Sequence, residues 1–188
     1  MQSLTFWAEH EHWPTIHLEV GDITTYSQDA IVTGVRPDFV LSGGVNTAVH
    51  RVAGTELGQA VAQFGSCPLG QAVISQGFKL PAKYVIHTAC PAYNANQDEQ
   101  CRQVLSQCYD SSLGLSLQHQ LTSLVFPSLA TGVFGFPHET SASLAARAIR
   151  NFLLEPSRYN SSLKDVYFLV YHEEEFGLYK EKFGEVFV

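Results

Sequence analysis

The chain has few basic residues and no long apolar run. Its 188 residues include 11 lysines and arginines against 18 aspartates and glutamates, which gives a formal net charge of −7. Binding along a nucleic-acid duplex requires a clustered Lys and Arg surface, so this balance argues against a duplex partner. No apolar run approaches the roughly 20 residues of a membrane span, and the first residues lack the basic flank and apolar stretch of a signal peptide. We therefore expect a soluble cytoplasmic protein with no membrane partner.

Patterns that hold metals or activate nucleophiles are also lacking. The chain contains no Gly-x-Ser-x-Gly elbow, P-loop, zinc-ligand spacing or paired-carboxylate motif. His10 and His12 flank Glu11, but no partner ligands can be assigned to them, so we expect a solvated segment rather than a metal site. The four cysteines form no C-x-x-C pair, which favours reduced thiols in or near the core over a catalytic nucleophile. They are Cys67, Cys90, Cys101 and Cys108. No metal or cofactor is expected.

Short apolar runs alternate with helical repeats along most of the chain. The apolar runs are bounded by Gly, Pro, Asp or Lys, as buried strands are, and they cover residues 16–20, 30–35, 72–74, 84–89, 123–126 and 166–171. Apolar residues at helical spacing mark residues 45–64, 101–115 and 144–152, and residues 173–183 form a closing helix. This alternation predicts an α/β fold with a largely parallel sheet covered on both faces. We expect one domain over residues 15–188, preceded by an N-terminal extension of residues 1–14.

Two loops follow predicted strands on the side of the sheet where ligands bind in such folds. Asp22 follows the first strand, where its carboxylate either accepts a hydrogen bond from an exocyclic amine or caps the next turn. Gly43 and Gly44 run directly into an amphipathic helix. Such a junction presents bare backbone amides to a phosphate, although it is also compatible with an ordinary tight turn.

A third loop, residues 130–137, leaves the strand at residues 123–126 with two glycines spaced around Phe134. Its backbone N–H groups can surround an anion while the aromatic ring covers a sugar or a base. The alternative is a connector whose aromatic rings pack inward. Oriented amides and helix dipoles hold a diphosphate without net positive charge, so an acidic chain is compatible with an anionic ligand.

In their order and spacing, these stretches resemble the macrodomain family, the α/β modules that bind ADP-ribose. The resemblance covers the chain from about Ile16 to Phe183. It rests on residues 21–24, 29–32, 43–54, 80–88 and 126–137, together with residues 167–171 and Tyr179. The chain is most similar to the bacterial and mitochondrial subgroup that hydrolyses mono-ADP-ribose from proteins and deacetylates O-acetyl-ADP-ribose. The resemblance implies a three-layer α/β/α fold with a mostly parallel central sheet.

The resemblance also implies a role for each loop. The implied ligands are ADP-ribose or O-acetyl-ADP-ribose, and mono-ADP-ribosylated proteins are candidate partners. Asp22 and Ile23 would contact adenine, with Tyr171 near the face of the base. Phe134 would pack on the distal ribose. The residues implied to meet the diphosphate are Gly43, Gly44, Val45, Thr131, Gly132 and Val133.

The chain departs from the pattern of that subgroup after the second strand. The subgroup usually carries Val-Asn-Ala-Ala-Asn, whereas residues 32–36 read Val-Thr-Gly-Val-Arg. The second asparagine holds the distal ribose in hydrolytic relatives, and its place falls on Arg36, a cation without an acceptor lone pair. Arg36 has three interpretations: a charge-assisted contact with the diphosphate or with a carboxylate of the substrate, a plug over the distal-ribose pocket, or an exposed residue in a turn with Pro37 and Asp38.

A second departure is Asn46, which stands in the place of the family's usual acidic residue, proposed to orient or activate the attacking water. An amide is a far poorer base than a carboxylate, so general-base catalysis from this position is lost, although Asn46 can still orient a water. His50 follows one helical turn later on the same face. It is either a base with a near-neutral pKa or a hydrogen-bonded histidine at the helix edge. Asn46 and His50 are the candidate catalytic residues.

These observations lead to three functional hypotheses. The first is a module that binds ADP-ribose or mono-ADP-ribosylated protein, with hydrolysis weak or absent because of Asn46 and Arg36. The second is an active mono-ADP-ribosyl hydrolase or O-acetyl-ADP-ribose deacetylase that uses His50 or a substrate-assisted water. The third is a degenerate domain that acts as a protein-interaction scaffold, with Arg36 closing the cleft.

Overall fold

A seven-stranded sheet runs through the part of the chain that the computed structural model describes, which is residues 2–6, 13–156 and 161–187. The strands are β1 (Ser3–Phe6), β2 (Thr15–Val20), β3 (Ala30–Val35), β4 (Ala72–Gln76), β5 (Tyr84–Ala89), β6 (Ser123–Pro127) and β7 (Asp165–Val170). The helices are α1 (Gly44–Ala53), α2 (Thr55–Ala62), α3 (Asp98–Gln118), α4 (His138–Leu154) and α5 (Glu173–Gly184), with short 3-10 turns η1 (Ile23–Thr25) and η2 (Ala95–Gln97). The candidate metal segment, residues 10–12, lies outside the described residues.

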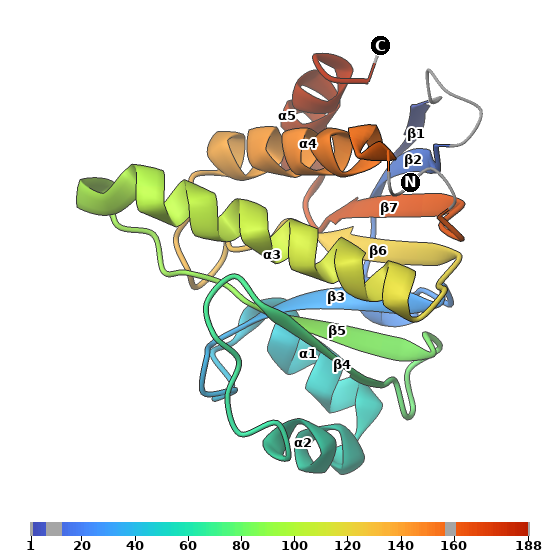
Figure 1. The fold of residues 1–188 in the computed structure, drawn as a ribbon, viewed down its shortest axis with the longest axis vertical. Coiled ribbons are helices and arrows are strands. Elements are labelled where there is room, and N and C mark those ends of the chain that lie inside the picture. The colour runs from blue at the N-terminus through green and yellow to red at the C-terminus, as the bar shows by residue number, and fades with distance from the viewer. Residues whose placement is uncertain (1, 7–12, 157–160, 188) are drawn as a thin grey trace.

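The strand order is β1-β2-β7-β6-β3-β5-β4, with parallel pairing from β2 through to β5 (Figure 1). Only the two edge pairs, β1 with β2 and β4 with β5, are antiparallel in the described chain. This arrangement confirms the predicted α/β class and the mostly parallel sheet. Because parallel strands end at the same edge, the loops after β2, β3, β6 and β7 meet on one side of the molecule.

The first strand lies inside the predicted N-terminal extension. β1 pairs with β2 along its whole length, with Ser3 opposite Glu19 and Phe6 opposite Ile16. Residues 3–6 are therefore part of the same sheet as the strands of the domain predicted over residues 15–188. A four-residue edge strand is too short to display the alternation by which strands are recognised in a sequence.

The helical pattern over residues 45–64 is divided into α1 and α2. Gly54 separates the two helices with φ of +92°, and its N–H donates to the carbonyl of His50. A positive φ is favourable for glycine and ends the first helix, while Thr55 starts the second. The apolar spacing continues across the break because both helices pack on the same face of the sheet.

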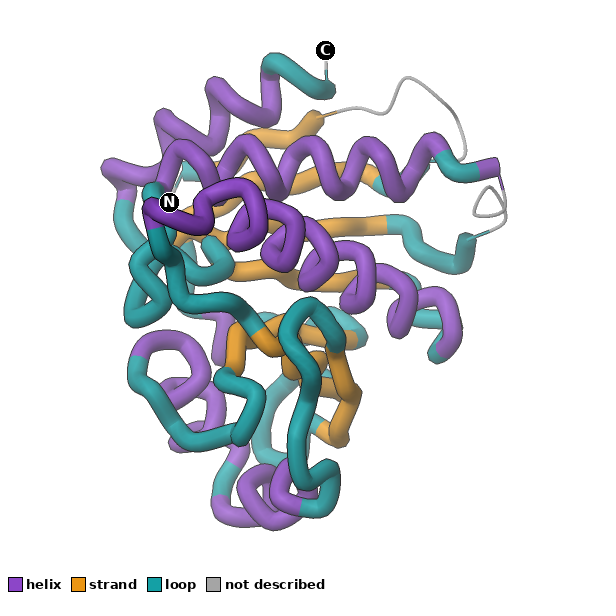
Figure 2. The backbone as a smooth tube through the Cα atoms, turned by 60° about the vertical axis from the view of Figure 1, so that its left-hand side comes forward, coloured by secondary structure: helices purple, strands orange, loops and turns teal. Residues whose placement is uncertain are grey.

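Helices cover both faces of the sheet and enclose two cores. The larger core lies under α3, α4 and α5, which lie beside one another across the strands (Figure 2). The smaller core lies under α1 and α2, against β3, β5, β6 and β7. All four cysteines are buried and unpaired, as expected for reduced core thiols.

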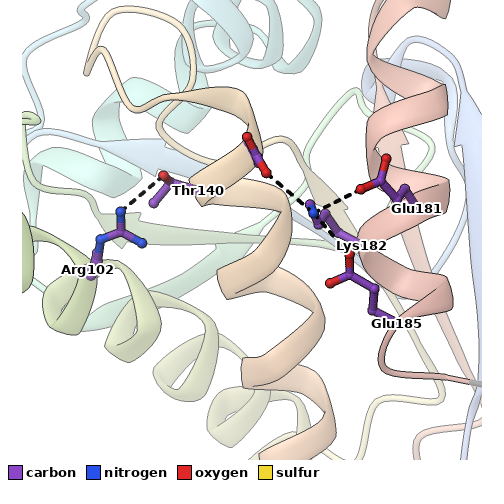
Figure 3. A network of polar contacts seen from close by, with 6 residues as sticks. Arg102, Thr140, Glu181, Lys182 and Glu185 are labelled. Carbon is purple, nitrogen blue, oxygen red and sulfur yellow. Dashed lines mark hydrogen bonds and ion pairs between the residues drawn. The ribbon is translucent and has the colours of Figure 1, made fainter.

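Polar contacts join the three helices of the larger layer (Figure 3). Arg102 of α3 donates to the hydroxyl of Thr140 in α4 over 3.4 Å. Lys182 of α5 contacts Glu139 of α4 and also Glu181 and Glu185 of its own chain segment. These carboxylates raise the pKa of Lys182. The contacts hold the first turn of α4 in place, immediately after the loop of residues 130–137.

His87 of β5 is fully buried between the sheet and α1, and its Nε2 lies 2.9 Å from the hydroxyl of Ser75. Burial, with a smaller contribution from the nearby His50 ring, lowers the pKa of His87 to about 3. The ordinary value, which applies to the unfolded chain, is about 6.5. The stability that depends on neutral His87 is therefore fully present above about pH 6.5 and is lost as the pH falls toward 3.

Between pH 7 and pH 5 we expect the wild-type protein to lose about 2 kcal/mol more unfolding free energy than His87→Gln, because only the histidine takes up a proton on unfolding. Glutamine retains a partner for Ser75. Urea denaturation of both proteins at pH 7, 6 and 5 measures the difference. Parallel pH profiles for the two proteins would contradict the expected protonation.

Candidate functional site

A cavity of about 840 Å³ opens where the parallel strands end, between the amino terminus of α1 and the loop that precedes α4. Asp22 follows β2, Gly34 lies in β3, and Tyr171 follows β7. Residues 127–134 form the wall after β6. The three loops singled out in the sequence therefore converge on one hollow, at the edge expected for a ligand in a parallel sheet.

Most of the predicted site residues line this cavity. They are Asp22, Ile23, Gly43, Gly44, Val45, Asn46, Thr131, Gly132, Val133, Phe134 and Tyr171. Arg36 and His50 are not among the lining residues. Further lining residues were not predicted from the sequence: Ala48 and Arg51, which follow Gly44 at helical spacing, and His138 and Glu175 from the starts of α4 and α5. The helical spacing could have revealed the first two.

At one end of the cavity, Asp22 uses one carboxylate oxygen to cap η1. Its Oδ1 accepts hydrogen bonds from the backbone N–H of Thr24 at 2.9 Å and from the Thr24 hydroxyl at 2.8 Å. Among the described residues, Oδ2 accepts none and is left for a ligand. Tyr171 is 69% exposed and lines the same cavity, with its ring edge-on to that of His172. The predicted capping role of Asp22 is confirmed, and it leaves an acceptor available.

At the amino terminus of α1, Gly43 and Gly44 have φ of +98° and +58°. No side chain caps the helix there, so its first amides remain available to an anion in the cavity. Across the cavity, Val133 approaches closely enough that a Cβ on Gly43 would lie 3.4 Å from its Cγ1. The two loops thus face each other over a narrow gap, and bare backbone at position 43 maintains it.

The loop of residues 130–137 is held by internal and tertiary hydrogen bonds. Phe136 donates its N–H to the carbonyl of Ala130, and its ring packs inward on Tyr93. Phe134 instead lines the cavity. Ser128 bridges the hydroxyls of Thr131, at 2.9 Å, and of the buried Tyr179 in α5, at 2.7 Å. Of the two arrangements considered for the aromatic rings of this loop, Phe134 has the cavity-facing one and Phe136 has the inward-packing one.

Asn46 lies at the cavity wall with only 3% of its surface exposed. Neither its Oδ1 nor its Nδ2 has a hydrogen-bond partner among the described residues, and the same holds for the buried Thr33 hydroxyl and Nδ1 of His87. Each unsatisfied buried polar atom costs about 1–3 kcal/mol. Because the unsatisfied carboxamide of Asn46 lies at the cavity wall, its oxygen and its nitrogen are available to hydrogen-bond a ligand or an ordered water.

His50 points away from the site that its helical spacing suggested. Its ring centroid lies 6.4 Å from that of His87 beneath α1. Partial burial lowers its pKa, which favours the neutral form. Asn46 and His50 share one side of α1, but the structure brings only Asn46 to the cavity.

Arg36 turns back on its own loop. Its Nε and Nη2 donate to the two carboxylate oxygens of Asp38 at 3.1 and 3.0 Å, and both side chains are about half exposed. This is the exposed-turn arrangement among the three interpretations of Arg36, and the residue does not fill the cavity. Gly34, in the same departure from the family pattern, lies over Cys90: an added Cβ would come within 3.0 Å of the Cys90 sulfur.

No group of three or more His, Cys, Asp or Glu side chains in the described residues could hold a metal ion. None of the described helices is both long enough and apolar enough to cross a membrane.

Comparison with known proteins agrees with this architecture. Residues 32–145 match the family described as Macro domain, and the chain belongs to that family. It is 40% identical over 169 residues to the O-acetyl-ADP-ribose deacetylase of Citrobacter rodentium, covering 88% of this chain and 93% of that one. It is 36% identical over 172 residues to the human ADP-ribose glycohydrolase MACROD2, covering 92% of this chain but only 40% of that protein.

Solved structures show the same similarity. The Oceanobacillus iheyensis macrodomain with ADP has a TM-score of 0.84 at 30% identity, with 98% of this chain and 96% of that one covered. The Trypanosoma brucei macrodomain in complex with ADP has a TM-score of 0.80 at 34% identity, with 89% and 68% covered.

Replacing Asn46 with leucine is expected to leave stability unchanged or raise it by about 1–2 kcal/mol, because two unsatisfied polar atoms are replaced by methyl groups in a side chain with the same branching, next to a cavity that has room for them. Asn46→Asp should lower stability, since it places an unpaired charge in the same buried position. Urea denaturation in the absence of ligand measures both changes. A clear loss of stability in the leucine variant would mean that the carboxamide is hydrogen-bonded in the free protein.

Proposed function

We propose that this chain binds ADP-ribose, free or as the mono-ADP-ribosyl group of a protein. In this proposal it hydrolyses the bond between that group and the protein weakly or not at all. The observation that carries the proposal is one cavity that joins a free carboxylate oxygen on Asp22 to the uncapped amino terminus of α1. The first suits an exocyclic amine and the second a phosphate. The related chains named for ADP-ribose chemistry, and those solved with ADP, support this assignment.

The base and the diphosphate occupy different parts of the cavity in this proposal. Adenine lies against Ile23, donates its amine to Asp22 and is covered by Tyr171, whose exposed ring supplies a stacking surface. The diphosphate lies at the amides of Gly43 and Gly44, opposite the loop that carries Val133. Backbone amides and the α1 dipole provide this contact in a protein with a net charge of −7.

The distal ribose then lies between Asn46 and Phe134, beyond the diphosphate. The acidic side chains that line the described cavity are Asp22, Glu174 and Glu175, which follow β2 and β7. Position 46, at the amino terminus of α1, carries a carboxamide, which is a far poorer base than a carboxylate for a proton from an attacking water, and this is the physical reason for weak hydrolysis.

An active hydrolase or deacetylase is the second candidate, and two observations favour it. Several related chains are named as ADP-ribose glycohydrolases or as an O-acetyl-ADP-ribose deacetylase. Asn46 also keeps a free donor and a free acceptor at the cavity wall. A water ordered there, assisted by the substrate diphosphate, is the route this candidate requires, because His50 does not line the cavity. The scaffold hypothesis has no support from Arg36, which leaves the cavity open.

Calorimetric titration with ADP-ribose tests binding, and Asp22→Asn tests the adenine contact. In this variant the remaining side-chain oxygen still caps η1, but an NH2 group replaces Oδ2 and cannot accept a hydrogen bond from the adenine amine. We expect its affinity to fall about ten- to hundredfold, the equivalent of one hydrogen bond to a charged group at about 1.5–3 kcal/mol. The hypoxanthine analogue of ADP-ribose, which lacks the amine, should bind the wild type weakly and the variant no worse. Absence of heat at millimolar ADP-ribose would refute the proposed function.

Incubation with a mono-ADP-ribosylated protein separates binding from hydrolysis. We expect little ADP-ribose release by the wild type over a long incubation, and faster release by Asn46→Asp if the variant folds, because the carboxylate restores a base. Chromatography of the released nucleotide provides the measurement. Rapid release by the wild type would establish the hydrolase instead, and its persistence in His50→Ala would assign the step to the ordered water.

A further inference from the structure

Five of the eight large apolar side chains exposed on the described surface lie on loops that reach the cavity through Val133 and through Gly43. Three connecting segments carry them: the loop before α1, the loop between α2 and β4, and the loop after β6. The five residues are Val40, Leu41, Phe64, Leu69 and Val133, which we call the rim patch. Val40 and Val133 are each 58% exposed. Scattered exposed apolar residues need no explanation, whereas a contiguous group beside a cavity marks a binding surface.

Contacts between the three loops make the rim patch continuous. Phe39, next to Val40, packs its ring 6.2 Å from that of Phe64. The backbone N–H of Cys67 donates to the carbonyl of Pro37 over 2.9 Å, which joins the loop of Leu69 to the loop before α1. Val133 closes the other side, where it meets Gly43.

The rim patch is electrically neutral in an acidic protein. The three loops, residues 36–41, 64–69 and 130–136, contain only two charged residues, Arg36 and Asp38, and these neutralise each other in a bidentate pair. The carboxylates that line the described cavity are those of Asp22, Glu174 and Glu175, and none of them belongs to the three loops. The rim patch therefore offers no unpaired charge to a strongly charged partner, whereas its apolar side chains can pack against an apolar partner.

The position of the rim patch follows from the direction of α1. The cavity follows α1 from Gly43 and Gly44 to Ala48 and Arg51, and α1 contacts η1, which begins at Ile23, so the proposed adenine site lies alongside the helix. The rim patch lies on the opposite side of the anion-binding turn, with Leu41 only two residues before Gly43. A ligand that runs from adenine through the diphosphate to the distal ribose thus points its far end at the rim patch.

We propose that the rim patch binds the polypeptide that carries the ADP-ribose, through uncharged apolar side chains that flank the modified residue. This inference rests on the proposed function, because the anomeric carbon of the distal ribose is the atom through which ADP-ribose is joined to a protein. A cavity that holds the nucleotide in this direction delivers the flanking peptide to Val40, Leu41 and Leu69. Free ADP-ribose does not reach these three side chains.

The test compares three ligands by calorimetry: free ADP-ribose, a peptide carrying ADP-ribose through a stable analogue linkage and flanked by Leu and Val, and the same peptide flanked by Ser and Gly. The wild type should bind the apolar-flanked peptide at least tenfold more tightly than the polar-flanked one. The double variant Val40→Asp with Leu69→Asp should lose this preference and bind free ADP-ribose with unchanged affinity. Its matched control is Phe78→Asp with Leu154→Asp, which adds the same charge at exposed apolar positions elsewhere and should retain the preference.

Equal affinity of the wild type for the two peptides would overturn the inference while leaving ADP-ribose binding intact. Failure to bind any of the three ligands would instead refute the proposed function on which it rests. A concentration-dependent dimer in sedimentation analysis that the Val40→Asp and Leu69→Asp variant dissociates would assign the rim patch to a second copy of the chain. Loss of the preference in the control variant would attribute the effect to added charge and also overturn the inference.

Discussion

Two consecutive glycines with positive φ, Gly43 and Gly44, set the geometry on which the cavity depends. They let the chain enter α1 without a side-chain cap, so the first amides of the helix remain unoccupied. A serine or aspartate cap would satisfy one of those amides internally and compete with an anion for it. The parallel sheet supplies the rest of the arrangement, because the loops after β2, β6 and β7 end at the same edge and face this helix terminus.

The predicted fold agrees closely with the structure where the sequence pattern is long and regular. β3 and β5 have the predicted bounds, because buried parallel strands are mostly apolar runs, and each of these two begins directly after a charged residue. The pattern did not reveal β1, which is four residues long, or the break at Gly54, since the apolar spacing runs on through it. Both features depend on backbone conformation or on pairing with a distant strand, neither of which alters local periodicity.

The place of the candidate site could also be predicted from the sequence, but the directions of its side chains could not. Loops that follow parallel strands must meet at one edge, so the lining roles of Asp22, Gly43 and Phe134 could be anticipated. The direction of a side chain within such a loop could not: Arg36 finds Asp38 two residues away, and His50 turns toward His87. His138 and Glu175 could not be predicted because the contact between them, 3.0 Å from Nδ1 of His138 to Oε1 of Glu175, joins helices far apart in the sequence.

The chain of hydroxyls from Thr131 through Ser128 to Tyr179 joins the ligand-facing loop to the last helix. Tyr179 is fully buried, with an apolar neighbour in Phe183, so its hydroxyl cannot move without displacing the packing of α5. The shape of the cavity is therefore tied to residues near the carboxyl terminus that touch no ligand. Removing the Ser128 hydroxyl would take from the buried Tyr179 hydroxyl its partner at 2.7 Å and from Thr131 its partner at 2.9 Å, so one serine couples the packing of α5 to the wall of the cavity.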